Sequence, residues 1–367
     1  MRIAAIHIYR YDIPFVRSLT IKRRTLSTRS GVIVRVTDET GASGYGDVAP
    51  LPGFSAERLE DTVCEAVRVA RSLTGCAVPD MPGRLSDHFE RWMRPHNLSP
   101  SLNCGLQTAV LELHAAGAGR SLAEYMNPDA AREVRVNALI SGDIDESAAQ
   151  ARSLREAGVT AAKLKVGRGK SVSEDVEKVR CVRDVLGDDV ELRLDANRAW
   201  DYDDAVRFGR GVAVCGIEFI EEPLKDPTRL VAYSAETGVP VALDETVVER
   251  GFDALERWRG VKAVVLKPTL LGGFEIAFWM ARRAWNVGMT PVISSAFESG
   301  IGLGGLAHLA AAMNQPRVAA GLDTYRWLAE DVLDEPLRLV HSVLDLDQVC
   351  AARTSINYDR MIEVDYE

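Results

Sequence analysis

The residues of this chain that could do chemistry stand at the ends of short apolar runs. The run Ala161-Ala-Lys-Leu-Lys-Val-Gly167 places Lys163 and Lys165 one residue apart in a strand-like segment. Side chains alternate between the faces of a strand, so both lysines point the same way. Two ammonium groups on a buried face are costly unless something neutralises or uses them. A solvated edge strand explains this run equally well by itself, and only the later runs favour a functional interpretation.

Four later apolar runs also end in charged residues, and they follow one another at intervals of about one strand and one helix. They are Arg193-Leu-Asp195-Ala-Asn197, Phe219-Ile-Glu221-Glu222-Pro223, Leu243-Asp244-Glu245 and Leu266-Lys267-Pro268. In parallel β/α barrels the chemistry lies at the carboxyl ends of the strands, where such residues become neighbours around one rim.

Three of these strand ends carry a carboxylate, from Asp195, Glu221 and Asp244. Carboxylates that are held together repel one another unless a cation lies between them. A donor set made only of oxygen atoms suits a hard divalent ion, so we expect Mg²⁺ at this rim. The competing explanation is three independent ion pairs. It is disfavoured because three successive strand ends are acidic and lie in apolar surroundings.

The lysines acquire a role once a metal lies between the carboxylates. Lys165 and Lys267 come from the second and sixth strands, on opposite sides of a barrel, and would flank a substrate above the ion. A lysine must lose its proton to act as a base. A neighbouring ammonium on Lys163 and the ion would favour the neutral amine, whereas the carboxylates would favour the charged form.

The elements that position these residues follow from the pattern after about residue 134, where strands and helices alternate. Eight strands separated by helices predict a parallel β/α barrel. No Gly-x-Gly-x-x-Gly follows the first strand, which argues against a dinucleotide fold. The expected strands are 136–141, 161–166, 191–195, 217–221, 240–244, 263–267, 290–294 and 318–322, and the expected helices include 146–156, 173–186, 202–210 and 274–285.

The first 130 residues predict a small α+β capping domain. Strands are expected at 2–10, 31–37 and 43–49, and helices at 56–73, capped by Ser55, and at 101–118. The basic stretch 14–29 lacks clean periodicity and is interpreted as a loop, or as a mobile lid whose Arg and Lys side chains meet an anionic substrate. The division is then 1–130 for the cap, 131–326 for the barrel, and 327–367 for a segment that returns to the cap.

Composition narrows the class of partner. The chain has 367 residues and a formal net charge of −9, which disfavours nucleic acid or an anionic membrane as a partner but permits a small anionic substrate. Its six cysteines form no Cys-x-x-Cys pair, as expected for reduced thiols in the cytoplasm rather than a zinc site. Neither a signal peptide nor a membrane-spanning run is expected. A homo-oligomer is compatible with the sequence.

With these residues in place, the chain resembles the muconate-lactonizing subgroup of the enolase superfamily. The matching stretches are Ala162-Lys-Leu-Lys165, Asp195-Ala-Asn197, Glu221-Glu-Pro223, Asp244-Glu245 and Leu266-Lys-Pro268. The resemblance implies a (β/α)₇β modified TIM barrel with an α+β cap. It also implies Mg²⁺ on Asp195, Glu221 and Asp244, with Lys165 as the acid/base and Lys267 facing it. No histidine stands at a strand end, which disfavours the mandelate-racemase subgroup.

Three further stretches resemble the o-succinylbenzoate synthases of menaquinone biosynthesis. They are 46–55, 292–300 and 321–328. The resemblance implies dehydration of a succinyl-hydroxycyclohexadiene carboxylate, in which Lys165 removes the proton next to the carboxylate and the metal holds the resulting enediolate. The side chains expected to contact substrate are Lys163, Asn197, Ser294, Ser295 and Glu298, although the last three could equally well cap a helix that begins near Ser299.

Two alternatives stay open at this point. An N-acylamino acid racemase or dipeptide epimerase of the same fold would use both lysines as bases, one on each face of the substrate. Such an epimerase usually has an Asp-x-Asp near the eighth strand, where this chain reads Leu322-Asp-Thr-Tyr325 with one aspartate. A non-catalytic carboxylate-binding protein is the more distant alternative, and the complete set of lysines and carboxylates argues against it.

Overall fold

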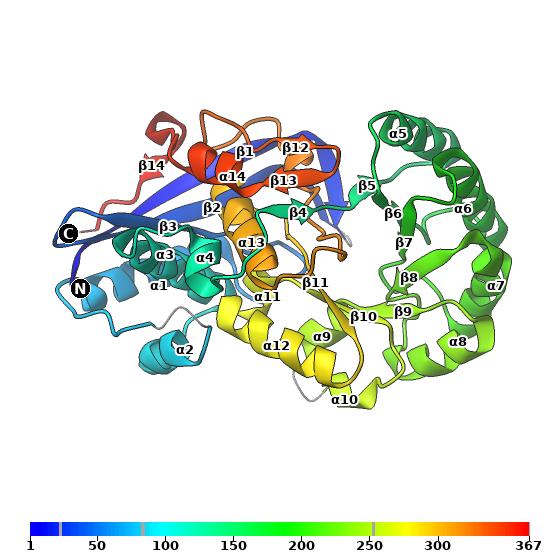
Figure 1. The fold of residues 1–367 in the computed structure, drawn as a ribbon, viewed down its shortest axis with the longest axis horizontal. Helices are drawn as coiled ribbons and strands as arrows, with labels where there is room; N and C mark the ends of the chain where they lie inside the picture. Colours follow the sequence, from blue (N-terminus) through cyan, green and yellow to red (C-terminus); the bar gives the residue numbers. More distant parts are fainter. Residues whose placement is uncertain (22–23, 82–84, 252–253, 367) are drawn as a thin grey trace.

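The computed structural model describes residues 1–21, 24–81, 85–251 and 254–366. A twisted antiparallel sheet with its helices forms a cap, and a curled parallel sheet wrapped by helices forms a barrel beside it (Figure 1). Both termini lie on the side of the cap in this view. Within the described residues, no helix has the length and apolar character that a bilayer crossing requires.

The cap sheet has the strand order β14-β1-β2-β3. Its long strands are β1 (Ile3–Ile21) and β2 (Arg24–Asp38), followed by β3 (Ser43–Val48). The helix α3 (Pro100–Gly117) lies so close to β3 that a Cβ at Gly46 would stand 1.8 Å from the Gly105 carbonyl oxygen. Only glycine permits this approach. The other helices of the cap are α1 (Leu59–Leu73), α2 (His88–Met93) and α4 (Leu122–Met126).

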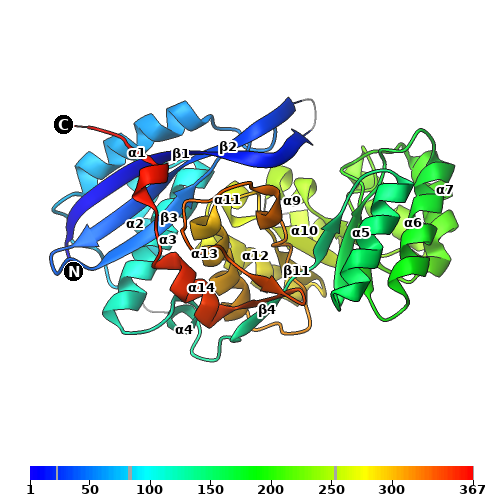
Figure 2. The ribbon, with the colours of Figure 1, turned by 90° about the horizontal axis from the view of Figure 1, so that it is seen from above.

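The stretch 14–29 is not the irregular loop that the sequence predicted. It continues β1 and β2 as one antiparallel hairpin, which reaches from the cap toward the barrel (Figure 2). The pairing shifts between Pro14↔Thr28 and Leu19↔Leu26, so several residues of β1 oppose fewer residues of β2. A bulge of this kind interrupts the alternation of apolar side chains, which hid the strands from sequence inspection. The predicted lid residues Lys22 and Arg23 lie outside the described part of the chain.

The predicted helix cap at Ser55 is also wrong. The helix α1 begins at Leu59 and its N-cap is Arg58, which makes no side-chain cap. The Ser55 hydroxyl instead accepts a hydrogen bond from the Leu51 backbone N–H at 2.8 Å and closes the turn before the helix. A serine in a tight Pro-rich turn can bond to its own loop as readily as to a helix end.

The barrel confirms the predicted succession of strands. Seven parallel strands pair in sequence order: β5 (Ala138–Ile140), β6 (Ala161–Lys165), β7 (Glu191–Asp195), β8 (Ile217–Glu221), β9 (Val241–Leu243), β10 (Ala263–Leu266) and β11 (Thr290–Ile293). Parallel bridges join Ala320 to Val136 and Gly321 to Ser294. The predicted eighth strand therefore lies between the last strand and the first, and closes the barrel.

The helices of the barrel cover the outside of the parallel sheet (Figure 1). Those on the first half are α5 (Ile144–Glu156), α6 (Val172–Leu186), α7 (Tyr202–Val212) and α8 (Leu230–Thr237). Those on the second half are α9 (Glu245–Arg250), α10 (Ala254–Arg257), α11 (Pro268–Leu271), α12 (Phe274–Asn286) and α13 (Gly300–Ala312). The four helices expected between strands are all present, with ends that differ by a few residues.

The C-terminal part of the chain adds strands to both parts of the molecule. β13 (Val343–Asp345) pairs with β12 (Leu339–Val340) and with β4 (Glu133–Arg135), and α14 (Leu346–Arg353) follows. β14 (Ile362–Glu363) then pairs with β1 of the cap sheet through Tyr9↔Glu363. The division at residues 130 and 326 stays a prediction.

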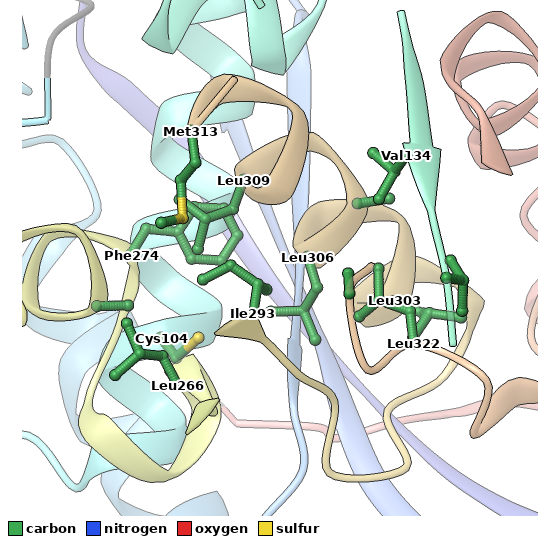
Figure 3. Close-up of a cluster of buried hydrophobic side chains, with 14 of the residues drawn as sticks. Cys104, Val134, Leu266, Phe274, Ile293, Leu303, Leu306, Leu309, Met313 and Leu322 are labelled. Atoms are coloured by element: carbon green, nitrogen blue, oxygen red, sulfur yellow. The ribbon is translucent and has the colours of Figure 1, made fainter. Parts of the chain in front are cut away.

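A shared apolar core joins cap and barrel around α13 (Figure 3). This helix is buried on nearly all sides, as expected from its uniformly apolar and small residues. Side chains from the cap, the barrel strands and the connecting helices meet there, among them Cys104, Val134, Leu266, Phe274, Ile293, Leu303, Leu306, Leu309, Met313 and Leu322. The mouth of the barrel and the cap are thereby fixed against each other.

Candidate active site

Three carboxylates meet at the rim of the barrel, as the sequence predicted. Asp195 ends β7, Glu221 ends β8, and Asp244 follows β9. The parallel register pairs Asp195 with Glu221 directly. One oxygen of each carboxylate lies within 4.8 Å of the others, and each residue is only 2% exposed. A buried set of oxygen donors at this spacing can hold a divalent metal ion.

The electrostatics of the three carboxylates reflect their crowding. Burial raises the pKa of Glu221 to about 7, against the attraction of Lys163 and with the repulsion of Asp195. Burial also acts on Asp195, but Lys165 and Lys163 outweigh it and hold the pKa of that carboxyl well below its usual range. Carboxylates this close to one another stay ionised only when positive charge lies among them.

Positive charge comes from three lysines that surround the carboxylates. Lys165 Nζ lies 2.6 Å from Asp195 Oδ2, and Lys267 Nζ lies 2.5 Å from Asp244 Oδ2. Lys163 Nζ lies 3.2 Å from Glu221 Oε2. Burial opposes the charged form of Lys267, yet Asp244 raises its pKa above the ordinary value. β6 and β10 are four positions apart in the sheet order, so Lys165 and Lys267 face each other across the mouth.

A second layer of acidic residues supports the first. Asn197, which follows β7, accepts a hydrogen bond from Lys165 Nζ at 2.8 Å and donates to Glu245 Oε1 at 3.0 Å. Glu222 Oε1 accepts hydrogen bonds from the backbone N–H groups of Asp244 and Thr246. Sequence reasoning assigned no role to Glu222 or Glu245. Their position next to Glu221 and Asp244 was the available signal, because a second buried carboxylate at a strand end is costly unless it is used.

The three lysines and Asp195 form the floor of a cavity of about 440 Å³. The barrel supplies its polar wall, and the cap supplies apolar side chains from the hairpin and from the turn after β3. The aromatic ring of Phe54 lies 5.5 Å from Lys267 Nζ. Residues of the cap that line this cavity are Leu19, Thr20, Ile21, Leu51 and Phe54. The cavity therefore needs both parts of the molecule.

The residues predicted near the seventh strand end take different positions. Ser294 and Ser295 line the cavity, and both hydroxyls donate to the Gly321 carbonyl oxygen, at 3.1 and 3.0 Å. Glu298 lies beside the cavity rather than on its wall. Its carboxylate accepts hydrogen bonds from Thr269 Oγ1 and from the Ala296 backbone N–H. None of the three caps α13, whose N-cap is Ser299, and the Ser299 side chain makes no capping hydrogen bond to the helix.

Arg29 is the basic residue of the hairpin with the most contacts, and these are not to the cavity. Its guanidinium is 1% exposed and donates to backbone carbonyl oxygens on both sides of the interface between cap and barrel. The acceptors include Pro50 at 2.9 Å in the cap and Phe297 at 2.8 Å in the loop after β11. The sequence suggested that the basic side chains of this stretch could meet the substrate. This is wrong for Arg29, because all of its N–H groups point to backbone carbonyl oxygens.

Arg17 also makes its contact away from the floor of the cavity. Its guanidinium lies 4.7 Å from the ring of Trp327, and its Nη2 donates to Ser141 Oγ at 3.3 Å. The hairpin is thus attached to the barrel rim by two arginines, one buried and one at the mouth.

Two family models match the chain in consecutive segments. The model for the MenC N-terminal domain matches residues 1–113, and the model for an enolase C-terminal domain-like fold matches residues 146–349. The first segment covers β1, β2 and β3 of the cap sheet and most of α3, and the second covers the barrel strands from β6 to β11, with the carboxylates and lysines.

Curated relatives are about one third identical to this chain over the aligned residues. Protein PHYLLO of Arabidopsis thaliana is 35% identical over 86% of the chain, which spans only 20% of that protein. The o-succinylbenzoate synthase of Vibrio cholerae is 35% identical over 86% of this chain and 88% of its own length.

Solved structures share the fold at lower identity. The muconate lactonizing enzyme of Pseudomonas fluorescens, complexed with muconolactone, has a TM-score of 0.82 at 24% identity over 94% of each chain. The dipeptide epimerase of Enterococcus faecalis, complexed with Mg and a dipeptide, has a TM-score of 0.83 at 23% identity over 94% of this chain and 97% of that one.

Proposed function

This chain belongs to the enolase superfamily, and on that premise we propose that it is an o-succinylbenzoate synthase, a carbon–oxygen lyase. The observation that carries the proposal is its 35% identity to the Vibrio cholerae enzyme over 86% of the chain, a span that includes both lysines and all three carboxylates. The match to the MenC N-terminal domain supports the same activity, because the cap supplies apolar side chains to the wall of the cavity.

Mg²⁺ is the ion that we propose for Asp195, Glu221 and Asp244. The donor set consists of oxygen atoms only, it is buried, and it comes from three neighbouring strands, which suits a hard cation. The ion would supply positive charge that stabilises negative charge developing on the substrate carboxylate.

Lys165 is the proposed acid and base. Neutral Nζ takes the proton from the carbon next to the ring carboxylate, and the ammonium then gives a proton to the departing hydroxyl group. The group leaves as water and the ring becomes aromatic, so Lys165 returns to its neutral form. Asn197 holds this amine through its side-chain oxygen at 2.8 Å and thereby orients it.

Lys267 faces the opposite side of the substrate. Its proposed role is to present positive charge to the ring as negative charge develops. Lys163 and Asn197 are proposed to orient the substrate carboxylate, and Ser294 and Ser295 to shape the wall of the cavity. Glu298 is proposed to hold the loop after β11 through Ala296 rather than to contact the substrate.

Racemisation of N-acylamino acids, or epimerisation of dipeptides, is the second candidate, which the facing pair Lys165 and Lys267 favours. The acidic residue of the eighth strand argues against the dipeptide. Asp323 lies 2.9 Å from Arg326 Nε and accepts a hydrogen bond from the Leu139 backbone N–H at 2.7 Å. Both contacts engage Oδ2, and this single aspartate is only half of the Asp-x-Asp pair that a dipeptide epimerase usually has.

A side-by-side assay with Mg²⁺ separates the candidates. We expect the purified protein to dehydrate the succinyl-hydroxycyclohexadiene carboxylate, and Lys165→Ala to lower kcat by about 10³-fold or more because the base is gone. Lys170→Ala, on the same loop but outside the cavity lining, should leave kcat unchanged. Racemisation of N-succinyl amino acids without dehydration would contradict the proposal, and inactivity toward both substrates would favour a non-catalytic binding protein.

The cellular setting is a further part of the proposal. The reaction belongs to menaquinone biosynthesis, and we place the enzyme in the cytoplasm, where its free cysteines would stay reduced. Growth of a mutant that lacks this step should be restored by the wild-type chain and not by Lys165→Ala.

A further inference from the structure

We propose that Arg168 binds the second carboxylate of the substrate, the one at the end of the succinyl chain. The inference rests on the proposed function, because only a dicarboxylate substrate presents such a group. Arg168 lies on the loop that leaves β6 three residues after Lys165, and it lines the same cavity as the lysines. It is exposed, so its guanidinium stands at the mouth rather than at the floor.

Arg168 differs from the lysines of the cavity because it is not paired with a carboxylate in the described part of the protein. Lys163, Lys165 and Lys267 each lie within 3.2 Å of an oxygen of Glu221, Asp195 or Asp244. Within the described residues, no ion pair or hydrogen bond involves the guanidinium of Arg168. It is therefore the one cation among the described lining residues whose charge is available to a ligand.

The charges of the site call for such a cation. The four acidic side chains in and beside the metal site, Asp195, Glu221, Asp244 and Glu245, carry two more formal charges than Lys163 and Lys267, with Lys165 as the neutral base. The proposed divalent ion cancels this excess, and the ring carboxylate of the substrate then adds one negative charge. The carboxylate at the end of the succinyl chain then has no counter-charge at the floor, whereas a guanidinium at the mouth would supply one.

The polar groups that compete for this role are already engaged. The hydroxyls of Ser294 and Ser295 donate to the Gly321 carbonyl oxygen and have no second proton to offer. Arg326 is paired with Asp323, and Arg17 lies over the ring of Trp327. These contacts leave Arg168 as the described basic group with free donors.

The loop after β6 is built so that Arg168 keeps its donors free. Gly167 has φ +75°, and a Cβ at this position would lie 2.2 Å from Ala199 Cβ, so only glycine makes the turn at the end of the strand. The nearby acidic side chains have other partners. Glu174 accepts a hydrogen bond from the Lys170 backbone N–H, and Asp175 lies 3.5 Å from Lys178 Nζ.

The test is a double-mutant cycle between the arginine and the carboxylate that it would bind. Two probes are titrated into the Mg²⁺-loaded protein by calorimetry: the product, o-succinylbenzoate, and its monoester at the succinyl carboxylate. For the wild type, we expect the ester to bind about tenfold more weakly than the diacid, the scale of one charge-assisted hydrogen bond near solvent. For Arg168→Met, we expect a tenfold loss with the diacid and a change below twofold with the ester.

Two further variants distinguish a direct contact from a general effect. Lys170→Met removes the same charge from the same loop outside the cavity lining and should leave both affinities unchanged. Arg168→Lys should recover part of the lost affinity for the diacid. In turnover, Arg168→Met should raise KM for the dicarboxylate substrate about tenfold and leave kcat within twofold.

Equal losses for both probes in Arg168→Met, or equal affinities of the wild type for diacid and ester, would overturn the inference while leaving the proposed function intact. A wild-type protein that neither dehydrates the substrate nor binds the diacid would overturn the proposed function, and this inference with it.

Discussion

Lys165 and Lys267 are alike in chemistry but different in surroundings. Lys165 Nζ donates to a carboxylate oxygen of Asp195 and to the amide oxygen of Asn197, and these two acceptors together orient the amine. Lys267 contacts both oxygens of Asp244 and lies 5.5 Å from the face of the Phe54 ring. The first environment orients an amine for proton transfer, and the second holds a positive charge in place. The two lysines should therefore differ in how they tolerate substitution by arginine.

Lys165→Arg should lower kcat by about 10³-fold, because a guanidinium does not lose its proton at any working pH. Lys267→Arg should keep kcat within about tenfold of the wild type, because only its charge is needed. Steady-state assays of dehydration at saturating Mg²⁺ measure both values. Equal losses in the two variants would show that Lys267 also transfers a proton.

Asp195, Glu221 and Asp244 come together because three neighbouring strands end at the same height. The register Lys165↔Asp195↔Glu221 continues across β6, β7 and β8, so the charged ends form a row along the rim. Neutralising one carboxylate removes a metal ligand without changing the volume of the side chain. Losing the ligand should therefore weaken metal binding more than it changes the stability of the fold.

Glu221→Gln should weaken Mg²⁺ binding by about 10²-fold, and dehydration should then require a correspondingly higher Mg²⁺ concentration. EDTA should abolish the activity of the wild type, and added Mg²⁺ should restore it. Glu177→Gln, on the exposed face of α6, is the matched control and should behave as wild type. Activity of the wild type that survives EDTA would contradict the metal site.

The β1–β2 hairpin reaches the barrel through Arg29, whose guanidinium joins three backbone segments. It donates to Ser30 in its own strand, to Pro50 before the turn that bears Phe54, and to Phe297 in the loop that bears Ser295. Asp47 makes a second connection, because it accepts hydrogen bonds from the backbone N–H and the hydroxyl of Ser299. Both walls of the cavity depend on these contacts.

Arg29→Met should lower the free energy of unfolding by about 3 kcal/mol, because several buried carbonyl groups lose their donor. It should also raise KM for the substrate, since both walls of the cavity lose a shared anchor. Urea unfolding followed by circular dichroism measures the first effect. Arg24→Met, at an exposed position of the same hairpin, should change stability by less than about 0.5 kcal/mol.

Cap, barrel and C-terminal segment meet around α13, and this junction contains a histidine that burial keeps neutral. His308 is 2% exposed; burial lowers its pKa to about 3, and the nearby Arg353 adds to the effect. Its Nε2 lies 3.7 Å from the Cys350 Sγ on α14. In the unfolded chain the same imidazole takes up a proton near pH 6.5. The junction should therefore weaken in acid.

The stability contributed by neutral His308 is present above pH 6.5 and is lost as the pH falls toward 3, because only the unfolded chain binds the proton. Between pH 6.5 and pH 5 the loss should be about 2 kcal/mol. His308→Gln should remove this part of the pH dependence, whereas His341→Gln, at the exposed turn between β12 and β13, should not. Urea unfolding at a series of pH values measures the slopes, and identical slopes for His308→Gln and the wild type would contradict the assignment.

The sequence by itself determined the barrel and the floor of its cavity. Each β/α unit is a local pattern of apolar periodicity, and a parallel barrel places every strand end at one rim whatever the loops do. Lys165, Asp195, Glu221, Asp244 and Lys267 could therefore be grouped from spacing alone, and the geometry brings them together.

Tertiary structure alone decided what covers that floor. The stretch 14–29 forms a hairpin because its strands pair with each other across a bulge and because Arg29 meets carbonyl groups contributed by residues up to 268 positions away. Ser55 bonds to its own turn, and Glu298 faces Thr269 rather than the cavity. The contacts of Arg29 and Glu298 depend on where distant parts of the chain stand, and Ser55 had two local partners to choose from, so the pattern of residues did not determine any of these positions.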